Sequence, residues 1–173
     1  MSATGAIGVL LVDDDAVVRE GYRGLLERAG DIVVRGEAAD ADQALSLFRE
    51  LAPDVVVMDI ALPGRSGIEA LRELRRIDPA ARVLVFSMYE DAIYAQRALA
   101  EGAIGYVTKA SAPGELVEAV RSVAAGEPWH TREVAQALAL QGPAAPRGES
   151  PLSARELQIL RLLVRGMPVR EIA

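Results

Sequence analysis

The stretch VVVMDIALPGRSGIE, residues 55–69, combines a short hydrophobic run, an acidic residue and a proline-containing loop. Its first four residues, Val55–Met58, are apolar without alternation, as expected of a parallel strand that is buried on both faces. A helical pattern follows at Gly67–Ile77. The stretch therefore predicts a strand, a loop and a helix, with Asp59 at the carboxyl end of the strand.

The same alternation of a β-rich run and an amphipathic segment repeats along residues 1–126. Repeats of this kind predict an α/β fold, a doubly wound five-stranded parallel sheet with helices on both faces and right-handed crossovers. The predicted strands are Ile7–Val12, Ile32–Ala38, Val55–Asp59, Arg82–Phe86 and Ile104–Thr108. The predicted helices are Ala16–Ala29, Asp40–Leu51, Gly67–Ile77, Glu90–Gly102 and Pro113–Ala125.

Polar residues gather where the predicted strands end. Ligands of such sheets bind beyond the carboxyl ends of the strands, so these side chains should share one site. Crowded carboxylates repel one another, and a hard divalent cation such as Mg²⁺ relieves that repulsion while it accepts phosphate oxygens. One carboxylate would remain as a nucleophile for a phosphoryl group. The residues at this edge are Asp13, Asp14, Asp15, Asp59, Ser87 and Lys109.

These motifs resemble the receiver domain of two-component response regulators. The carrying segments are LLVDDD, VVVMDIALPGRSGIE, VLVFSM and GYVTKA, which occur in the family's order across residues 7–126. The resemblance implies a flavodoxin-like sheet in the order 2-1-3-4-5. It also implies a protein that catalyses its own phosphorylation by a sensor histidine kinase but is a regulator, not an enzyme in the usual sense.

The resemblance assigns roles to individual residues. It makes Asp59 the phosphoacceptor, places Mg²⁺ on Asp13, Asp14, Asp59 and the backbone carbonyl of Ala61, and gives Lys109 a phosphate contact. It implies that Ser87 and Tyr106 are switch residues, although Tyr106 is equally well explained as a core aromatic. Ala61 and Tyr89 would flank the water that hydrolyses the phosphoryl group, and neither orients water well, which predicts a long-lived phosphorylated state.

The C-terminal part is different in composition. Residues 127–150 predict a linker with one short helix, Thr131–Leu140, for which Thr131 is a plausible N-cap. Residues 151–173 resemble the opening of a LuxR-type helix-turn-helix domain, which indicates the NarL/FixJ class. Arg165 and Arg170 could contact the DNA backbone, but a solvated helix face explains them slightly better.

The recognition helix of such a domain is not among these residues. We therefore expect a DNA partner only where the further C-terminal helices are present, and no specific DNA binding by residues 1–173. A homodimer through receiver domains is also compatible with the resemblance.

The composition excludes several other classes of protein. The chain has no cysteine, which excludes disulfides, thiolate catalysis and cysteine-based zinc sites. The longest apolar runs, such as Ile7–Val12, are far too short to cross a bilayer, and no secretory signal is recognisable. We expect a cytoplasmic protein with no membrane partner.

Simpler interpretations stand beside these roles. An Asp between a strand and a helix is often only an N-cap, an interpretation that suits Asp15 better than Asp13 or Asp14. His130, the single histidine, is better explained as a linker residue near Trp129 than as a catalytic group.

Two rival functions remain open. A haloacid-dehalogenase-type phosphohydrolase would also form an aspartyl phosphate, but it usually carries a second Asp two residues after the nucleophile, where this chain has Ala61. A module that switches by binding alone would not need the acidic residues and lysine that are present.

Overall fold

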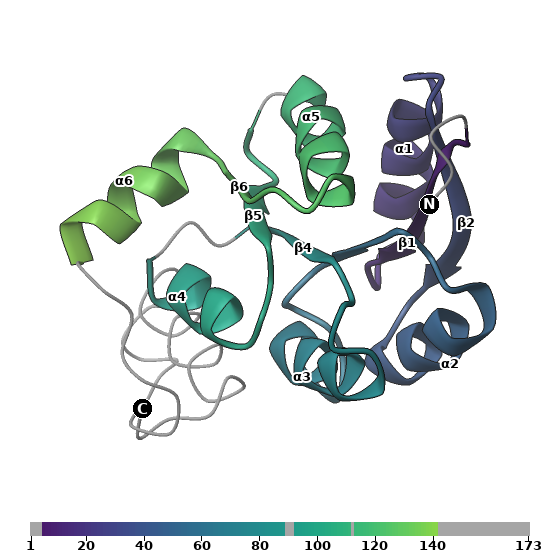
Figure 1. The fold of residues 1–173 in the computed structure, drawn as a ribbon, viewed down its shortest axis with the longest axis horizontal. Coiled ribbons are helices and arrows are strands. Elements are labelled where there is room, and N and C mark those ends of the chain that lie inside the picture. The colour runs from purple at the N-terminus through teal and green to yellow at the C-terminus, as the bar shows by residue number, and fades with distance from the viewer. Residues whose placement is uncertain (1–4, 89–91, 112, 142–173) are drawn as a thin grey trace, which may run out of the picture.

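The sheet of this protein has parallel strands throughout and is covered by helices on both faces (Figure 1). The computed structural model describes residues 5–88, 92–111 and 113–141. The strand order is β2-β1-β3-β4-β5-β6. The strands are β1 (Ile7–Val12), β2 (Ile32–Ala38), β3 (Val55–Met58), β4 (Val83–Ser87), β5 (Gly105–Thr108) and β6 (Trp129–His130).

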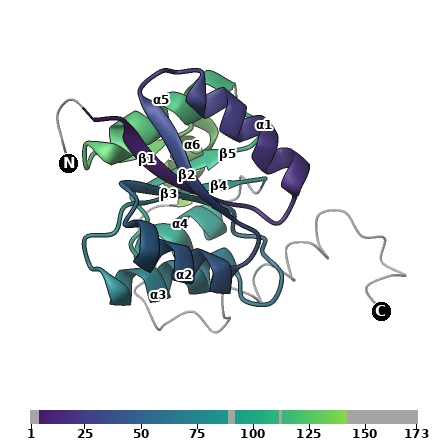
Figure 2. The same cartoon turned by 90° about the vertical axis from the view of Figure 1, so that its right-hand side faces the viewer.

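Helices α1 and α5 cover one face of the sheet, and α2, α3 and α4 cover the other (Figure 2). This arrangement confirms the doubly wound fold and the 2-1-3-4-5 order of the first five strands. The helices are α1 (Ala16–Glu27), α2 (Ala41–Leu51), α3 (Gly67–Ile77), α4 (Ala92–Ala100), α5 (Pro113–Ala124) and α6 (Arg132–Gln141).

The apolar strands form two cores because successive side chains point to opposite faces of the sheet. In β1, Leu10 and Val12 belong to the core under α2, α3 and α4, whereas Val9 and Leu11 belong to the core under α1 and α5. All four residues of β3 are buried, as the continuous run VVVM predicts.

Side-chain caps mark the starts of α1 and α3. Asp15 caps α1 by accepting hydrogen bonds from the backbone N–H groups of Val17 and Val18, which confirms the cap interpretation for this residue. Ser66 and Glu69 form a reciprocal capping box at the start of α3. These caps fix the residue at which each helix begins after the loop at the carboxyl end of its strand.

Gly67 is required where α3 passes the end of β3. A Cβ added there would lie 2.1 Å from the carbonyl oxygen of Asp59, so no larger residue fits without moving this backbone. The N–H of Gly67 donates to the carbonyl of Ile60 at 2.8 Å. The close approach thereby ties the start of α3 to the loop that follows Asp59.

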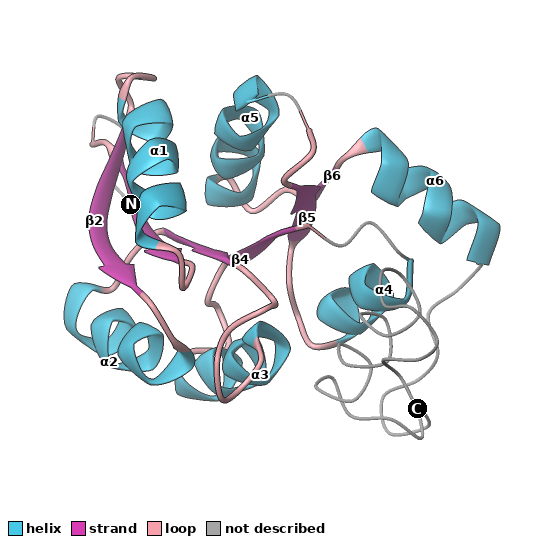
Figure 3. Ribbon diagram, turned by 180° about the vertical axis from the view of Figure 1, so that it is seen from behind, coloured by secondary structure: helices cyan, strands magenta, loops and turns pink. Residues whose placement is uncertain are grey.

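The predicted count of five strands is wrong, because residues 129–130 add a sixth. β6 pairs in parallel with β5, with Gly105 opposite Trp129 and Tyr106 opposite His130. A two-residue strand has no periodicity that a sequence could reveal, which explains why these residues were predicted as part of the linker. The chain then enters α6, which packs on α4 and β5 (Figure 3).

Within the described ranges, no helix is long and apolar enough to cross a membrane.

Candidate functional site at the carboxyl ends of β1 and β3

Three carboxylates meet at the edge of the sheet where β1 and β3 end. Asp13, Asp14 and Asp59 each offer one oxygen, and these oxygens lie within 4.8 Å of one another. Asp13 and Asp59 are buried and Asp14 is exposed. Several carboxylate oxygens in one small volume fit a hard divalent cation, so this donor set suits Mg²⁺.

Lys109 follows β5 and joins the two buried carboxylates. Its Nζ donates to Asp13 Oδ2 at 2.5 Å and to Asp59 Oδ2 at 2.9 Å. The ammonium group also lies 5.7 Å from the centre of the Phe86 ring. One buried cation thus links the ends of three strands and partly neutralises the acidic cluster.

The charges of this cluster shift one another's pKa. Burial raises the pKa of Asp59, and Lys109 opposes the shift without cancelling it. Burial lowers the pKa of Lys109, but the hydrogen bonds and charges of Asp13 and Asp59 outweigh it, and the net shift is upward. The lysine therefore stays charged at neutral pH beside carboxylates whose repulsion it relieves.

The remaining oxygens of Asp13 and Asp59 are held by the backbone. Asp59 Oδ1 accepts a hydrogen bond from the N–H of Ala61 at 3.0 Å, and Asp13 Oδ1 accepts from the N–H of Asp15 at 2.9 Å. The structure therefore places the backbone N–H of Ala61 beside the Asp59 carboxylate, whereas the metal contact predicted for the Ala61 carbonyl stays a prediction. These hydrogen bonds orient both carboxylates.

Arg19 of α1 supports the backbone of this site and was not predicted from the sequence. Arg19 Nη1 donates to the backbone carbonyl of Asp13 at 2.5 Å, and its Nε donates to Glu37 Oε1 at 3.0 Å. Glu37 also accepts from Arg23 Nη1 at 2.8 Å. Only the spacing of Arg19 four residues after the Asp15 cap could have indicated that its side chain points back towards β1.

The two residues predicted as switches lie on neighbouring strands. Ser87 ends β4 and is fully buried, and its carbonyl accepts the N–H of Lys109 at 2.7 Å. Tyr106 of β5 is also fully buried and belongs to the core on the α4 side, which its interpretation as a core aromatic requires. Tyr89, Arg165 and Arg170, for which roles were also predicted, lie outside the described residues.

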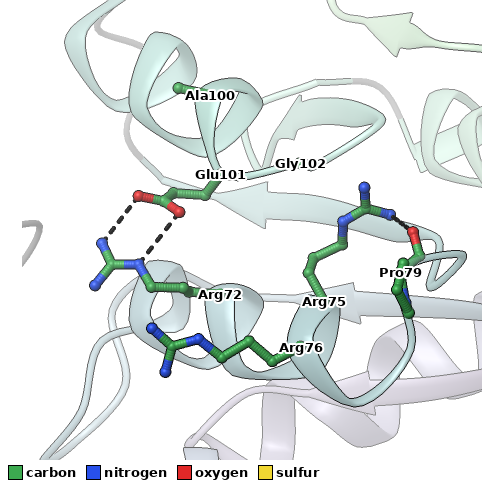
Figure 4. A pocket seen from close by; sticks show the side chains of 7 residues that line it. All are labelled: Arg72, Arg75, Arg76, Pro79, Ala100, Glu101 and Gly102. Carbon is green, nitrogen blue, oxygen red and sulfur yellow. Dashed lines mark hydrogen bonds and ion pairs between the residues drawn. The ribbon is translucent and has the colours of Figure 1, made fainter. Parts of the chain in front are cut away.

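A cavity of about 330 Å³ lies away from the acidic cluster, between the C-terminal half of α3 and the end of α4 (Figure 4). Glu101 is buried there and accepts two hydrogen bonds from Arg72, at 2.9 and 3.2 Å. Arg75 bonds the backbone carbonyls of Pro79 and Ala81, and Arg76 pairs with Glu73. Arg75 and Arg76 lie in the last turn of α3, where cations stabilise the helix. The Arg72–Glu101 pair ties α3 to the residue that follows α4.

A parallel sheet in this order, with an acidic cluster and a lysine at its carboxyl edge, defines the receiver class of phosphorylation-controlled domains. Residues 9–121 match the family model described as the response regulator receiver domain, and the chain belongs to that family. It is a phosphorylation-dependent response regulator of two-component signal transduction.

Relatives of known type agree with this assignment. The chain is 38% identical over 170 residues to the response regulator UvrY of Escherichia coli, a match that covers 96% of this chain and 78% of UvrY. A crystal structure of a LuxR-family two-component response regulator from Aurantimonas sp. shares 47% identity at a TM-score of 0.77, over 79% of this chain and 98% of that one. A structure of two RcsB dimers bound to two parallel DNAs shares 26% identity at a TM-score of 0.72, over 98% of this chain and 82% of that one.

Proposed function

We propose that Asp59 accepts a phosphoryl group from a phosphohistidine of a sensor histidine kinase, with Mg²⁺ held by Asp13, Asp14 and Asp59. The observation that carries the proposal is the position of Asp59, whose buried carboxylate lies 2.9 Å from Lys109 Nζ and beside two further carboxylates. A nucleophile, a cation to hold phosphate oxygens and a metal donor set thereby share one edge of the sheet.

The step requires little beyond positioning and neutralisation of charge. An oxygen of the Asp59 carboxylate forms a bond to phosphorus as the bond from phosphorus to the imidazole nitrogen breaks, and the leaving imidazole takes up a proton. Lys109 moves from the carboxylate oxygen to an oxygen of the transferred group, where its charge offsets the new negative charge. When bound, Mg²⁺ supplies further positive charge to the phosphoryl oxygens. The backbone carbonyl of Ala61 would be a further metal ligand beside the three carboxylates, with water and phosphoryl oxygens in the remaining positions.

The protein acts on itself in this proposal. Asp59 is the nucleophile, and the product is the same side chain carrying the phosphoryl group. Each chain therefore accepts one phosphoryl group, which it later loses slowly by hydrolysis. Ser87 would contact the phosphoryl group from β4, which connects the chemistry to the neighbouring strand β5.

The output of the protein is DNA binding in this proposal. Residues 1–126 form the receiver, residues 127–150 connect it, and residues 151–173 begin a helix-turn-helix domain. The similarity over 98% of this chain to RcsB, whose structure contains DNA, supports this division. A helix of such a domain would read the major groove, and dimerisation of receivers would pair two of these domains on DNA.

Intact-mass measurement after incubation with acetyl phosphate and Mg²⁺ tests the chemistry. We expect the mass of one added phosphoryl group in the unmodified chain and none in Asp59→Asn, because an amide is a poor nucleophile. The matched control is Asp42→Asn, which removes an exposed carboxylate on α2 outside the site. A phosphoryl group retained on Asp59→Asn would overturn the assignment, and continuous release of inorganic phosphate without a stable adduct would favour a phosphohydrolase.

A further inference from the structure

The ammonium group of Lys109 lies over an aromatic ring as well as beside two carboxylates. Phe86 of β4 is 4% exposed, and the centre of its ring lies 5.7 Å from Lys109 Nζ. The face of an aromatic ring carries partial negative charge, so it attracts a cation within about 6 Å of its centre. The attraction is strongest where water is excluded, and the side chain of Lys109 is only 10% exposed.

A second ring fixes the orientation of the first. Tyr22 of α1 meets Phe86 with the ring centres 4.6 Å apart and the ring planes at 90°. This edge-to-face arrangement is one of the two that aromatic pairs favour, and it resists rotation of either ring. Helix α1 therefore holds the ring of Phe86 in place under Lys109.

Close packing alone does not fix the position of Lys109. A cavity of about 110 Å³ borders its side chain, and Tyr22, Phe86 and Leu116 are among the other residues that line it. A side chain beside a cavity lacks packing contacts on that side, so it has room to shift. The position of the ammonium group therefore depends on its hydrogen bonds to Asp13 and Asp59 and on the ring.

The ring and the carboxylates differ in what happens to them during phosphoryl transfer. In the proposed reaction, Lys109 exchanges an oxygen of Asp59 for an oxygen of the transferred group. A hydrogen bond weakens steeply as the donor turns away from its acceptor, whereas attraction to a ring face depends on where the charge lies and not on the direction of one N–H. The ring therefore continues to hold the ammonium group while one of its hydrogen bonds is exchanged.

We propose that Phe86 is a positioning residue for phosphoryl transfer, whose ring face, held by Tyr22, keeps the ammonium group of Lys109 aligned with the incoming phosphoryl oxygens. The proposal rests on the assignment of Asp59 as phosphoacceptor. Phe86 acts only through Lys109, and small errors in the placement of a charged group are costly in a reaction that depends on positioning.

Fluorinated phenylalanines test the charge of the ring at nearly constant shape. Fluorine withdraws electrons from the ring face, so monofluoro-, trifluoro- and pentafluorophenylalanine at position 86 weaken its attraction for a cation in steps. We expect the rate of phosphorylation of the full chain by acetyl phosphate at saturating Mg²⁺ to fall stepwise, by about 2- to 30-fold in all. The Mg²⁺ concentration that half-saturates the reaction should stay unchanged, because carboxylates and not Lys109 form the metal donor set.

The chain offers a matched control, because it contains only one other phenylalanine. Phe48 of α2 is 7% exposed and belongs to the core on the other face of the sheet. The same fluorinated residues at position 48 should leave the rate of phosphorylation unchanged. Tyr22→Leu, which removes the supporting ring, should slow phosphorylation, and the conservative Tyr22→Phe should restore the rate.

An unfolding cycle tests the contact without phosphorylation. Pentafluorophenylalanine at position 86 should lower the urea midpoint of unfolding more in the chain with Lys109 than in Lys109→Met, because only the ammonium group is attracted to the ring face. Both chains are measured with Mg²⁺. An equal change in the two chains would show that the ring does not act on the charge, and would overturn the proposal.

The outcomes separate this proposal from the assignment of Asp59. Absence of the added phosphoryl mass in the unmodified chain would defeat the phosphoacceptor assignment and the role of Phe86 with it. A chain that is phosphorylated at the same rate throughout the series at position 86 would overturn the role of Phe86 alone. An equal fall in rate with the series at position 48, or a change confined to the Mg²⁺ requirement, would also overturn it.

Discussion

Lys109→Met should destabilise the folded protein strongly in the absence of divalent cations. The side chain of Lys109 is 10% exposed, and those of its partners Asp13 and Asp59 are 5% and 8% exposed. Methionine keeps the length of the side chain but leaves two buried carboxylates without their shared counter-charge. Removing one partner of a buried ion pair costs about 3–5 kcal/mol.

The electrostatic geometry gives a similar magnitude. Ligand oxygens of Asp13 and Asp59 lie within 4.8 Å, a separation at which two unit charges repel by about 3–4 kcal/mol at an effective dielectric constant of about 20. Small domains are stable by only about 5–15 kcal/mol in total, so this loss should be obvious. Mg²⁺ should restore part of it, about 2.7 kcal/mol at a concentration one hundred times its dissociation constant.

Urea unfolding at pH 7.5, with EDTA or with Mg²⁺, measures both effects. The control Arg121→Met removes a cation that is 38% exposed and paired with Asp31, and it should leave the unfolding free energy nearly unchanged because solvent screens the pair. The double variant Lys109→Met/Asp59→Asn should be more stable than Lys109→Met alone, because one of the two facing charges is gone. Equal stability of wild type and Lys109→Met in EDTA would refute the reasoning.

The pH dependence of this contribution has a definite sign. Because the folded-state pKa of Lys109 is raised above its ordinary value of 10.5, the folded state binds the proton more tightly than the unfolded state does. Its contribution to stability is fully present below pH 10.5 and is lost as the pH rises through the higher folded-state pKa. The difference between wild type and Lys109→Met should therefore persist from pH 7 to pH 10.

Four further results are expected. Asp59→Asn should raise the melting temperature without Mg²⁺ at neutral pH, because burial raises the pKa of this carboxyl and the folded state therefore disfavours its ionised form above pH 3.8; an unchanged melting temperature would contradict this. Glu101→Ala should lower the urea-unfolding free energy by about 2–3 kcal/mol, less than for a fully buried pair because its arginine partner is partly exposed. Arg19→Ala should raise the Mg²⁺ concentration that half-saturates phosphorylation by acetyl phosphate and leave the rate at saturating Mg²⁺ nearly unchanged; a fall in that maximal rate alone would refute its positioning role. Ala61→Asn should accelerate decay of the phosphorylated protein after the donor is removed, because the amide can orient water; equal decay rates would show that this position does not control the lifetime.

Local sequence was enough to predict the fold of residues 7–124. It also predicted which acidic residues and which lysine meet at the candidate site. Continuous apolar runs such as Val55–Met58 predict strands buried on both faces, and the alternation with amphipathic helices leaves a parallel sheet as the solution. Once the strands are parallel, residues that follow them must meet at one edge. The sequence therefore predicted that Asp13, Asp59 and Lys109 are neighbours, although Asp13 and Lys109 are 96 positions apart in the chain.

Only the tertiary structure decided what supports the site and what covers the sheet. Arg19 bonds a backbone carbonyl, and although its spacing from Asp15 suggests the direction of the side chain, the sequence cannot identify the partner because every residue has a carbonyl. β6 is two residues long, so its existence depends on the free edge of β5 and not on its own propensity. Thr131 is a residue type that favours N-caps and lies at the N-cap position of α6. The packing around it nevertheless leaves its hydroxyl without a hydrogen-bond partner. Periodicity and caps are short-range properties that a sequence records, whereas the partner of a buried polar atom depends on whichever segment folds over it.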